Sequence, residues 1–278
     1  MKRMLLIHDL CSVGKAAMMN MIPVLSVMGI EVCPLPTMLL STHTGGFGKP
    51  EILPVPGNYL KESLRHFQRE NITFDCVFVG YLGNVPMVET VLELLKTGPA
   101  PFVICDPIMG DHGKYYSNFD DSYREALCAL LGEADLLLPN LTEAALLSGV
   151  PYEEGMTGEG LHAIVSRLCE MGMKKGIITG TNVGEHRIGM AIVEGGFVEQ
   201  YTETEVLYQS HGTGDLFDAV LAGAILKGAT LKEAAFQAHN FVAACLQEKA
   251  GQAGNERRRP AVRAAFGKTC DNLKKMSR

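Results

Sequence analysis

Short, unbroken apolar runs alternate with helix-length segments from the start of the chain to about residue 180, and this pattern constrains the fold more than any other feature. A strand buried on both faces is apolar throughout, because helices cover the sheet on either side. The alternation therefore predicts an α/β fold with a mostly parallel sheet. We expect its strands at residues 4–7, 31–35, 76–79, 102–105, 135–138 and 176–179.

Two further strand-like runs, residues 187–193 and 197–202, are separated by a short turn that contains two glycines. This pattern predicts a β-hairpin that adds antiparallel strands at one edge of the sheet. A polar turn is expected at residues 8–15, and a mobile loop or lid at residues 39–50. Helices are expected at residues 16–28 with a kink at Pro23, 57–70, after the 81–84 turn through 95, 123–131, after 139–143 to 147, 158–171, up to 227, 231–249, and after Pro260.

The composition is that of a globular enzyme and excludes several classes of partner. The net charge is -6 and the pI is near 5.8, so nothing indicates a nucleic acid or an anionic membrane as partner. Eight cysteines lie scattered without a C-x-x-C pair, which argues against a zinc site and favours a reducing, cytoplasmic location. The first apolar run is too short for a signal peptide, and none approaches the ~20 residues of a membrane span. We expect a single domain over residues 1–278.

Polar residues follow the predicted strands where a ligand would meet them. In open α/β sheets, ligands bind at the carboxyl ends of the strands. This shared location marks a set of candidate binding residues, namely Asp9, Ser12, Tyr81, Asp106, Asp111, Asn140, Glu143, Thr179 and Gly180.

A glycine-rich stretch, Gly212, Thr213, Gly214 and Asp215, leads directly into a small-residue apolar helix. Two glycines allow consecutive backbone N–H groups to point one way at a helix start, where the macrodipole favours an anion. Such a pocket suits a phosphoryl group that gathers charge during transfer. Asp215 at its rim could accept a proton from a substrate hydroxyl. The alternative is an ordinary helix N-cap.

Two pairs of polar residues could serve a metal or nucleotide. Asp106 and Asp111 flank a turn and suit a divalent cation or the amines of a nucleotide site, unless they only cap their own backbone. Asn140 and Glu143 share one face of a helix start and could hold Mg²⁺ through its waters. They also match a capping box, and the two interpretations are compatible.

Other signals are weaker or absent. Thr179 could contact phosphates, although a plain turn is the better explanation of this stretch taken alone. Neither a P-loop nor a strand-linked G-x-G-x-x-G motif occurs, which argues against a dinucleotide-binding oxidoreductase. The histidines nearest the predicted site, His8, His43 and His211, are expected to be structural or to face solvent.

Five motifs in order, at residues 40–45, 79–83, 105–111, 134–144 and 212–217, carry a resemblance that spans nearly the whole chain. The chain resembles the ribokinase-like superfamily and, within it, the pyridoxal kinase family of vitamin B6 salvage. The resemblance implies a three-layer α/β/α fold and ATP-dependent phosphorylation of the hydroxymethyl group of a pyridoxine-type vitamer. It also implies Mg²⁺, often K⁺, and usually a homodimer.

The same resemblance implies roles for individual residues. Asp215 matches the catalytic base, and the residues before it match the anion hole. The remaining positions match nucleotide, metal and substrate contacts, with Asp111, Thr179, Gly212 and Thr213 at the phosphates, Asn140 with Glu143 and Asp106 around Mg²⁺, and Asp9, Ser12, Thr44 and Tyr81 at the vitamer.

Three positions depart from the family pattern. Asp9 replaces a frequent serine and could bind a pyridinium N–H or a ring hydroxyl, a feature shared with hydroxymethylpyrimidine kinases. Leu138 replaces a threonine that could bind K⁺, and Thr42 replaces an asparagine. The alternatives are therefore a hydroxymethylpyrimidine (phosphate) kinase of thiamine synthesis, a sugar kinase, and a non-catalytic vitamer- or nucleotide-binding protein.

Overall fold

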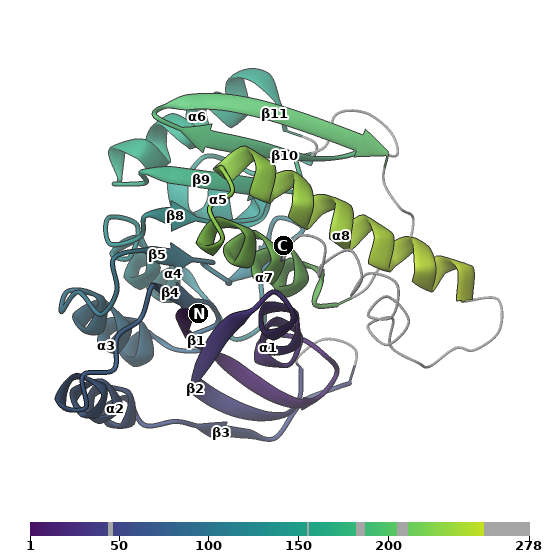
Figure 1. Ribbon diagram of the computed structural model, residues 1–278. Helices are drawn as coiled ribbons and strands as arrows, with labels where there is room; N and C mark the ends of the chain where they lie inside the picture. Colours follow the sequence, from purple (N-terminus) through teal and green to yellow (C-terminus); the bar gives the residue numbers. More distant parts are fainter. Residues whose placement is uncertain (44–46, 155, 182–186, 205–210, 253–278) are drawn as a thin grey trace. The chain divides into compact units, whose positions relative to one another are not determined.

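The structure is a computed structural model that describes residues 1–43, 47–154, 156–181, 187–204 and 211–252 (Figure 1). It divides into two compact units. The first unit joins Met1–Pro54 to Val206–Arg278, and the second unit is Val55–Glu205. Thr44, the basic run at 257–259 and the helix expected after Pro260 lie outside the described residues.

In its described residues, the first unit combines three strands with three helices. Its strands are β1 (Lys2–Val13), β2 (Ile30–Thr42) and β3 (Ile52–Pro54), and its helices are α1 (Met18–Val27), α7 (Thr213–Leu226) and α8 (Leu231–Gln252). Strand β2 pairs in parallel with β1 and antiparallel with β3. The small residues of α7 allow close packing on α1, since a Cβ on Gly223 would lie 2.6 Å from the sulfur of Met28.

Two sequence predictions for this unit are wrong in extent. Strand β1 runs on to Val13, so residues 8–13 are not a polar turn, and β2 runs on to Thr42, so residues 39–42 are not part of a loop. The reason is mutual pairing, because the two extensions satisfy each other's backbone groups as far as Val13 and Thr42. The pairing shifts register between His8 and Leu10. Pairing between the two strands therefore determines the conformation of residues 8–13 and 39–42, and the polarity of the local sequence does not.

The second unit holds the remaining elements. Its strands run in the order β4, β5, β8, β9, β10, β11, parallel as far as β9 and antiparallel beyond it. The predicted edge hairpin is thus confirmed (Figure 1). The strands are β4 (Cys76–Val79), β5 (Val103–Cys105), β8 (Leu136–Leu137), β9 (Lys175–Thr179), β10 (Arg187–Glu194) and β11 (Phe197–Thr204). The helices are α2 (Gly57–Arg69), α3 (Val85–Leu95), α4 (Asp121–Cys128), α5 (Leu141–Ser148) and α6 (Gly158–Glu170).

A small hairpin in this unit was not predicted. Strands β6 (Gly110–Asp111) and β7 (Lys114–Tyr115) pair antiparallel across His112 and Gly113. Both turn residues have left-handed backbones, with φ of 49° and 73°, as a type I′ turn requires. His112-Gly113 is not one of the Asn-Gly, Asp-Gly or Gly-Gly pairs that mark this turn in a sequence, which explains why the pattern gave no hairpin signal.

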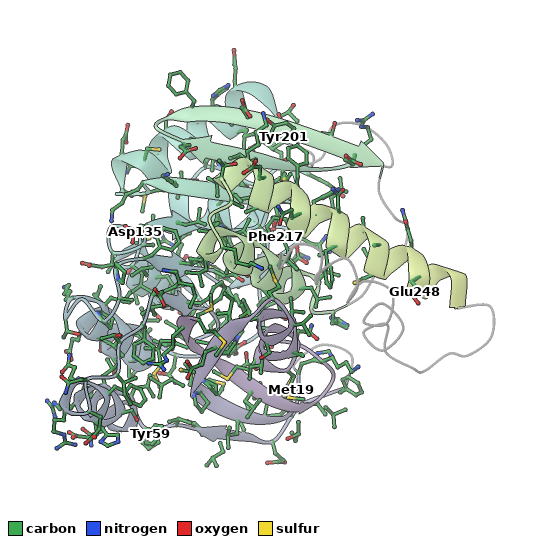
Figure 2. All side chains as sticks on the ribbon, in the orientation of Figure 1. Met19, Tyr59, Asp135, Tyr201, Phe217 and Glu248 are labelled. Atoms are coloured by element: carbon green, nitrogen blue, oxygen red, sulfur yellow. The ribbon has the colours of Figure 1, made fainter. Side chains whose placement is uncertain are left out.

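The helices carry both exposed and buried side chains. Figure 2 marks Met19 on α1 and Tyr59 on α2, which are exposed, and Phe217 on α7, which is buried. None of the helices in the described ranges combines the length and the hydropathy that a membrane crossing needs.

Candidate functional site

The first unit places Asp215 in the first turn of α7. The helix begins after Gly212, whose φ is 77°, and among the described residues no side chain caps it. The first N–H groups of a helix have no intrahelical partner, so those of Thr213 and Gly214 remain available to an anion. Asp215 Oδ2 accepts a hydrogen bond of 2.8 Å from the backbone N–H of Ala17. The carboxylate is thereby fixed beside an uncapped helix start.

Gly212 is required at this position for two reasons. Its left-handed backbone is costly for a residue with a Cβ, and a Cβ would lie 2.4 Å from Asn20 Nδ2 and 2.6 Å from the carbonyl oxygen of Lys15. Asn20 Nδ2 donates to the Gly212 carbonyl at 3.1 Å. Asn20 is almost fully buried on α1, so it fixes the direction of the glycine peptide.

The turn between β1 and α1 that meets this helix start has an unusual backbone. Lys15 and Ala17 have φ of 44° and 55°, which is unfavourable for residues with side chains. Such conformations persist where surrounding structure fixes them, often at functional sites. Here the turn aims the Ala17 N–H at Asp215, and it delays the start of α1 to Met18 rather than residue 16.

His8 lies between two carboxylates. Its Nε2 is 3.4 Å from Asp215 Oδ1, and its Nδ1 is 2.8 Å from Asp9 Oδ1. Burial lowers the pKa of His8, but the polar contacts and negative charges of Asp215 and Asp9 outweigh burial and raise it to about 10. The two carboxylates thus favour the protonated form of a ring that is almost fully buried, so the expectation that His8 faces solvent is wrong.

Two more histidines lie in the same unit. The His43 ring is 4.8 Å from the His211 ring and 5.0 Å from the Phe47 ring, centroid to centroid. Burial, followed by the charge of His211, lowers the pKa of His43. A Cβ on Gly14 would lie 1.9 Å from the His43 ring, so the glycine is needed for this close packing.

The predicted substrate contacts of this unit lie on a strand rather than in a turn. Asp9 is buried on β1, with one oxygen on His8, and Ser12 is exposed near the end of the same strand. Thr44 lies outside the described residues.

The second unit brings Asn140, Glu143 and Asp106 together. Asn140 Oδ1 accepts from the Glu143 N–H, and Glu143 Oε2 accepts from the Asn140 N–H, both at 2.9 Å, which confirms the capping box. Glu143 Oε1 accepts from the N–H of Met109 at 3.0 Å, and Asn140 Nδ2 donates to the Gly110 carbonyl at 2.9 Å. The start of α5 is thus tied to the turn that follows β5.

The charges in this cluster favour a cation. Burial, followed by the negative charge of Asp106, raises the pKa of Glu143 well above its ordinary value. No group of three or more His, Cys, Asp or Glu side chains suited to a metal occurs in the described ranges. Two carboxylates nevertheless fit Mg²⁺, which takes one or two protein carboxylates and completes its shell with waters and phosphates.

The other predicted nucleotide contacts lie nearby or in solvent. Thr179, at the end of β9, forms a parallel bridge with Asn140 and donates its N–H to the Pro139 carbonyl at 3.0 Å. Asp111 lies one residue beyond Gly110 and is exposed, and its Oδ1 accepts from the His112 N–H. The structure therefore groups Thr179 with Asn140, whereas the Asp111 side chain turns back to its own hairpin.

Tyr81, a predicted vitamer contact, follows β4 beside an aromatic cluster. Its ring is 5.4 Å from Phe119, which stacks on Tyr123 at 3.9 Å between centroids. Its hydroxyl accepts a hydrogen bond of 2.8 Å from Asn118 Nδ2. Sequence reasoning did not single out Asn118, Phe119, Asn20 or Ala17, because each acts through contacts that no local motif records.

Comparison with solved structures defines the class of the fold. A pyridoxal kinase from Lactobacillus plantarum is 31% identical with a TM-score of 0.88, over 99% of this chain and 98% of that one. A Bacteroides thetaiotaomicron protein described as a phosphomethylpyrimidine kinase, crystallised with pyridoxal, is 29% identical with a TM-score of 0.86, over 98% and 96% of the two chains. The protein therefore has the ribokinase-like α/β/α fold, with a mostly parallel sheet and an antiparallel edge hairpin.

Sequence relatives identify the family within that class. The model of the phosphomethylpyrimidine kinase family matches residues 22–259, and the chain belongs to this family. The pyridoxal kinase of Arabidopsis thaliana is 29% identical over 216 residues, which cover 72% of this chain and 66% of that protein. The match thus spans just under two thirds of the length of this relative, and the same share of a relative from Caenorhabditis elegans.

Proposed function

We propose that the chain is an ATP-dependent kinase that phosphorylates the hydroxymethyl group of a vitamin B6 vitamer, pyridoxal, pyridoxine or pyridoxamine, to the 5′-phosphate. The observation that carries the proposal is the Asp215 carboxylate beside the uncapped, glycine-started helix α7. A base next to an anion-binding helix start is what transfer of a phosphoryl group to an alcohol requires. The named activities of the relatives support the choice of vitamer.

In this mechanism Asp215 accepts the proton of the substrate hydroxyl as the γ-phosphoryl group passes in line. The N–H groups at Gly212, Thr213 and Gly214 hold the charge that gathers on the phosphoryl oxygens. The protein positions the reactants and neutralises charge, with little covalent chemistry of its own. The backbone turn at Ala17 contributes by fixing one oxygen of the base.

The second unit contributes nucleotide and metal ligands. We assign Asn140, Asp111 and Thr179 to ATP, and Glu143 with Asp106 to Mg²⁺. When bound, Mg²⁺ neutralises phosphate charge. Because the oxygens of Glu143 already accept backbone N–H groups, it acts on the ion most simply through water. K⁺ is a further ion in this proposal.

The vitamer pocket is assigned to Asp9, Ser12, Thr44 and Tyr81. Asp9 Oδ1 is engaged by His8, so its Oδ2 is the oxygen that we assign to the pyridine ring. Tyr81 stacks on that ring, with its orientation set by Asn118 and Phe119.

A substrate panel tests the function. Pyridoxal, pyridoxine, pyridoxamine and hydroxymethylpyrimidine are each supplied with ATP, and ADP release and the phosphorylated product are measured. We expect turnover with at least one vitamer. Turnover with hydroxymethylpyrimidine alone would instead support the second candidate, which the family's name and Asp9 favour. Tight vitamer binding without ADP release would support a non-catalytic binding protein.

Three broader properties belong to the same proposal. We propose one kinase domain made of both units, a cytoplasmic location, and a homodimer. Sedimentation of the purified chain tests the dimer. Limited proteolysis tests the single domain, because a protease would cut independent domains apart at residues 54–55 or 205–206 and both fragments would stay folded.

A further inference from the structure

We propose that His8, oriented by Asp9, is a positioning residue for the base Asp215, and that it acts as a buried cation. This inference rests on the proposed function only for its kinetic consequences. His8 and Asp9 are adjacent residues of strand β1. Asp215 lies at the start of helix α7, more than 200 residues further along the chain.

The geometry fixes both ends of the Asp215 carboxylate. Oδ2 accepts the Ala17 N–H at 2.8 Å, and Oδ1 faces His8 Nε2 at 3.4 Å. The second distance is long for a hydrogen bond, so the contact is an ion pair that leaves a lone pair of Oδ1 for a substrate proton. A carboxylate held at both oxygens cannot rotate away from the alcohol it must deprotonate.

Asp9 fixes the imidazole in turn. His8 Nδ1 is 2.8 Å from Asp9 Oδ1 and 2.9 Å from the Asp9 backbone N–H. If Nδ1 carries no proton, it accepts the backbone N–H of Asp9. If Nδ1 is protonated, it donates to the Asp9 carboxylate instead. Because two carboxylates flank a ring that is 1% exposed, the protonated form is favoured.

Other titratable groups near this arrangement do not replace His8. Burial raises the pKa of the Cys11 thiol, which keeps it neutral, and its Sγ donates to the Ala16 carbonyl. Burial lowers the pKa of His43, which keeps that ring neutral as well. His211 packs against His43, and Lys15 lies in the turn between β1 and α1. Among the described residues of the first unit, His8 is thus a buried ring in contact with the base.

The first experiment measures the charge directly. We record nitrogen chemical shifts of the histidine side chains in the full chain between pH 6 and 10, and assign His8 by its loss in His8→Gln. We expect a doubly protonated ring at pH 7.5, with a pKa that falls in Asp215→Asn and in Asp9→Asn. A neutral His8 ring at pH 7.5 overturns the inference whether or not the chain is a kinase.

The second experiment measures the consequence for turnover. We expect His8→Gln to lower kcat about 10–100-fold while the KM for ATP changes little, because a misplaced base costs about that much. Wild-type kcat should decline as the pH rises toward 10, as His8 loses its proton, and this decline should be absent from His8→Gln. The matched control is His162→Gln on the exposed face of α6, which should behave like wild type.

A double-mutant comparison of Asp9 and His8 distinguishes a positioning role for His8 from a general loss of structure. In kcat, Asp9→Asn combined with His8→Gln should cost little more than His8→Gln alone, since Asp9 acts on the base through the ring. The proposed contact of Asp9 with the vitamer should appear in KM instead. Unchanged kcat in a folded His8→Gln variant, or additive losses, would overturn the inference. If His8→Gln does not fold, Asp9→Asn provides the same pH-profile comparison. Absence of turnover with every vitamer would defeat the proposed function, and the nitrogen shifts would still decide the charge of His8.

Discussion

Two helix starts carry an acidic residue at the same position, and the two carboxylates are used differently. Glu143 is the third residue of α5 and Asp215 is the third residue of α7. Glu143 turns back to the N–H of its own N-cap, Asn140, whereas Asp215 turns outward to Ala17 and His8. The difference arises at the N-cap, where α5 has an asparagine and α7 has a glycine in a left-handed conformation.

This comparison shows how a cap determines function. In α5 the capping box satisfies the end of the helix, so its carboxylate stabilises the local fold. In α7 the glycine supplies no side chain, so the first N–H groups and the carboxylate both stay available to a ligand. We therefore expect changes in the α7 start to affect turnover and changes in the α5 start to affect stability and metal binding.

The largest effect should come from Asp215→Asn. Removing the base should lower kcat at least ~10²–10³-fold, as loss of one well-placed transition-state group does in other enzymes, with little change in fold. Steady-state kinetics with the best vitamer, alongside circular dichroism, measure both quantities. Near wild-type turnover would end the assignment of Asp215.

Gly212→Ala should follow in size. The new Cβ would collide with Asn20 and Lys15 in a backbone conformation that alanine rarely adopts, so the N–H groups behind it must move. We expect a kcat loss of about 10–100-fold, since small displacements at a transfer site are costly. Gly132→Ala is the matched control, because nothing lies within 4 Å of its added Cβ. Equal kinetics for the two variants would contradict the steric argument.

Glu143→Gln should act mainly on stability. Above its raised pKa, Glu143 accepts at both oxygens, whereas the amide can accept at only one of its two ends. One N–H that the carboxylate satisfies would then face a donor. A buried donor left unsatisfied costs about 1–3 kcal/mol. Urea unfolding measures this loss, and a Mg²⁺ titration of ADP release should show weaker dependence on the ion. A kcat loss as deep as that of Asp215→Asn, without destabilisation, would reverse the contrast between the two helix starts.

The pH dependence of stability should report the same cluster. The raised pKa of Glu143 means that the folded protein keeps a proton that the unfolded chain releases above about pH 4.5. Its contribution to stability is therefore greatest below that pH and is lost as the pH rises through the raised pKa. Asp106→Asn removes the like charge and should flatten this decline above pH 4.5. Parallel unfolding curves for variant and wild type would show that Asp106 is not the cause.

The smallest effect should come from Asn118→Ala. This variant removes the hydrogen bond to the Tyr81 hydroxyl and leaves the ring in place against Phe119. One such bond is worth about 0.5–1.5 kcal/mol, so KM for the vitamer should rise about 2–10-fold with kcat nearly constant. An unchanged KM would separate Tyr81 from vitamer binding.

The sequence predicts local features well and long-range ones poorly. The Gly212–Asp215 stretch and the capping box are each encoded within four residues, and the edge hairpin follows from one glycine turn. The extensions of β1 and β2 were missed because their polar residues are held by pairing between strands. His8 and Ala17 were missed because their partner Asp215 is about two hundred residues away, and no spacing rule connects them.

The first unit is discontinuous, since Met1–Pro54 is completed by a segment that begins only at Val206. During synthesis on the ribosome, β1 and α1 therefore emerge long before α7, against which α1 packs. The intervening second unit is contiguous and has all of its own residues before that helix exists. A nascent chain stalled ahead of residue 206 would hold an unfinished amino-terminal core with exposed apolar surface, which makes this stage of synthesis the one most in need of a chaperone.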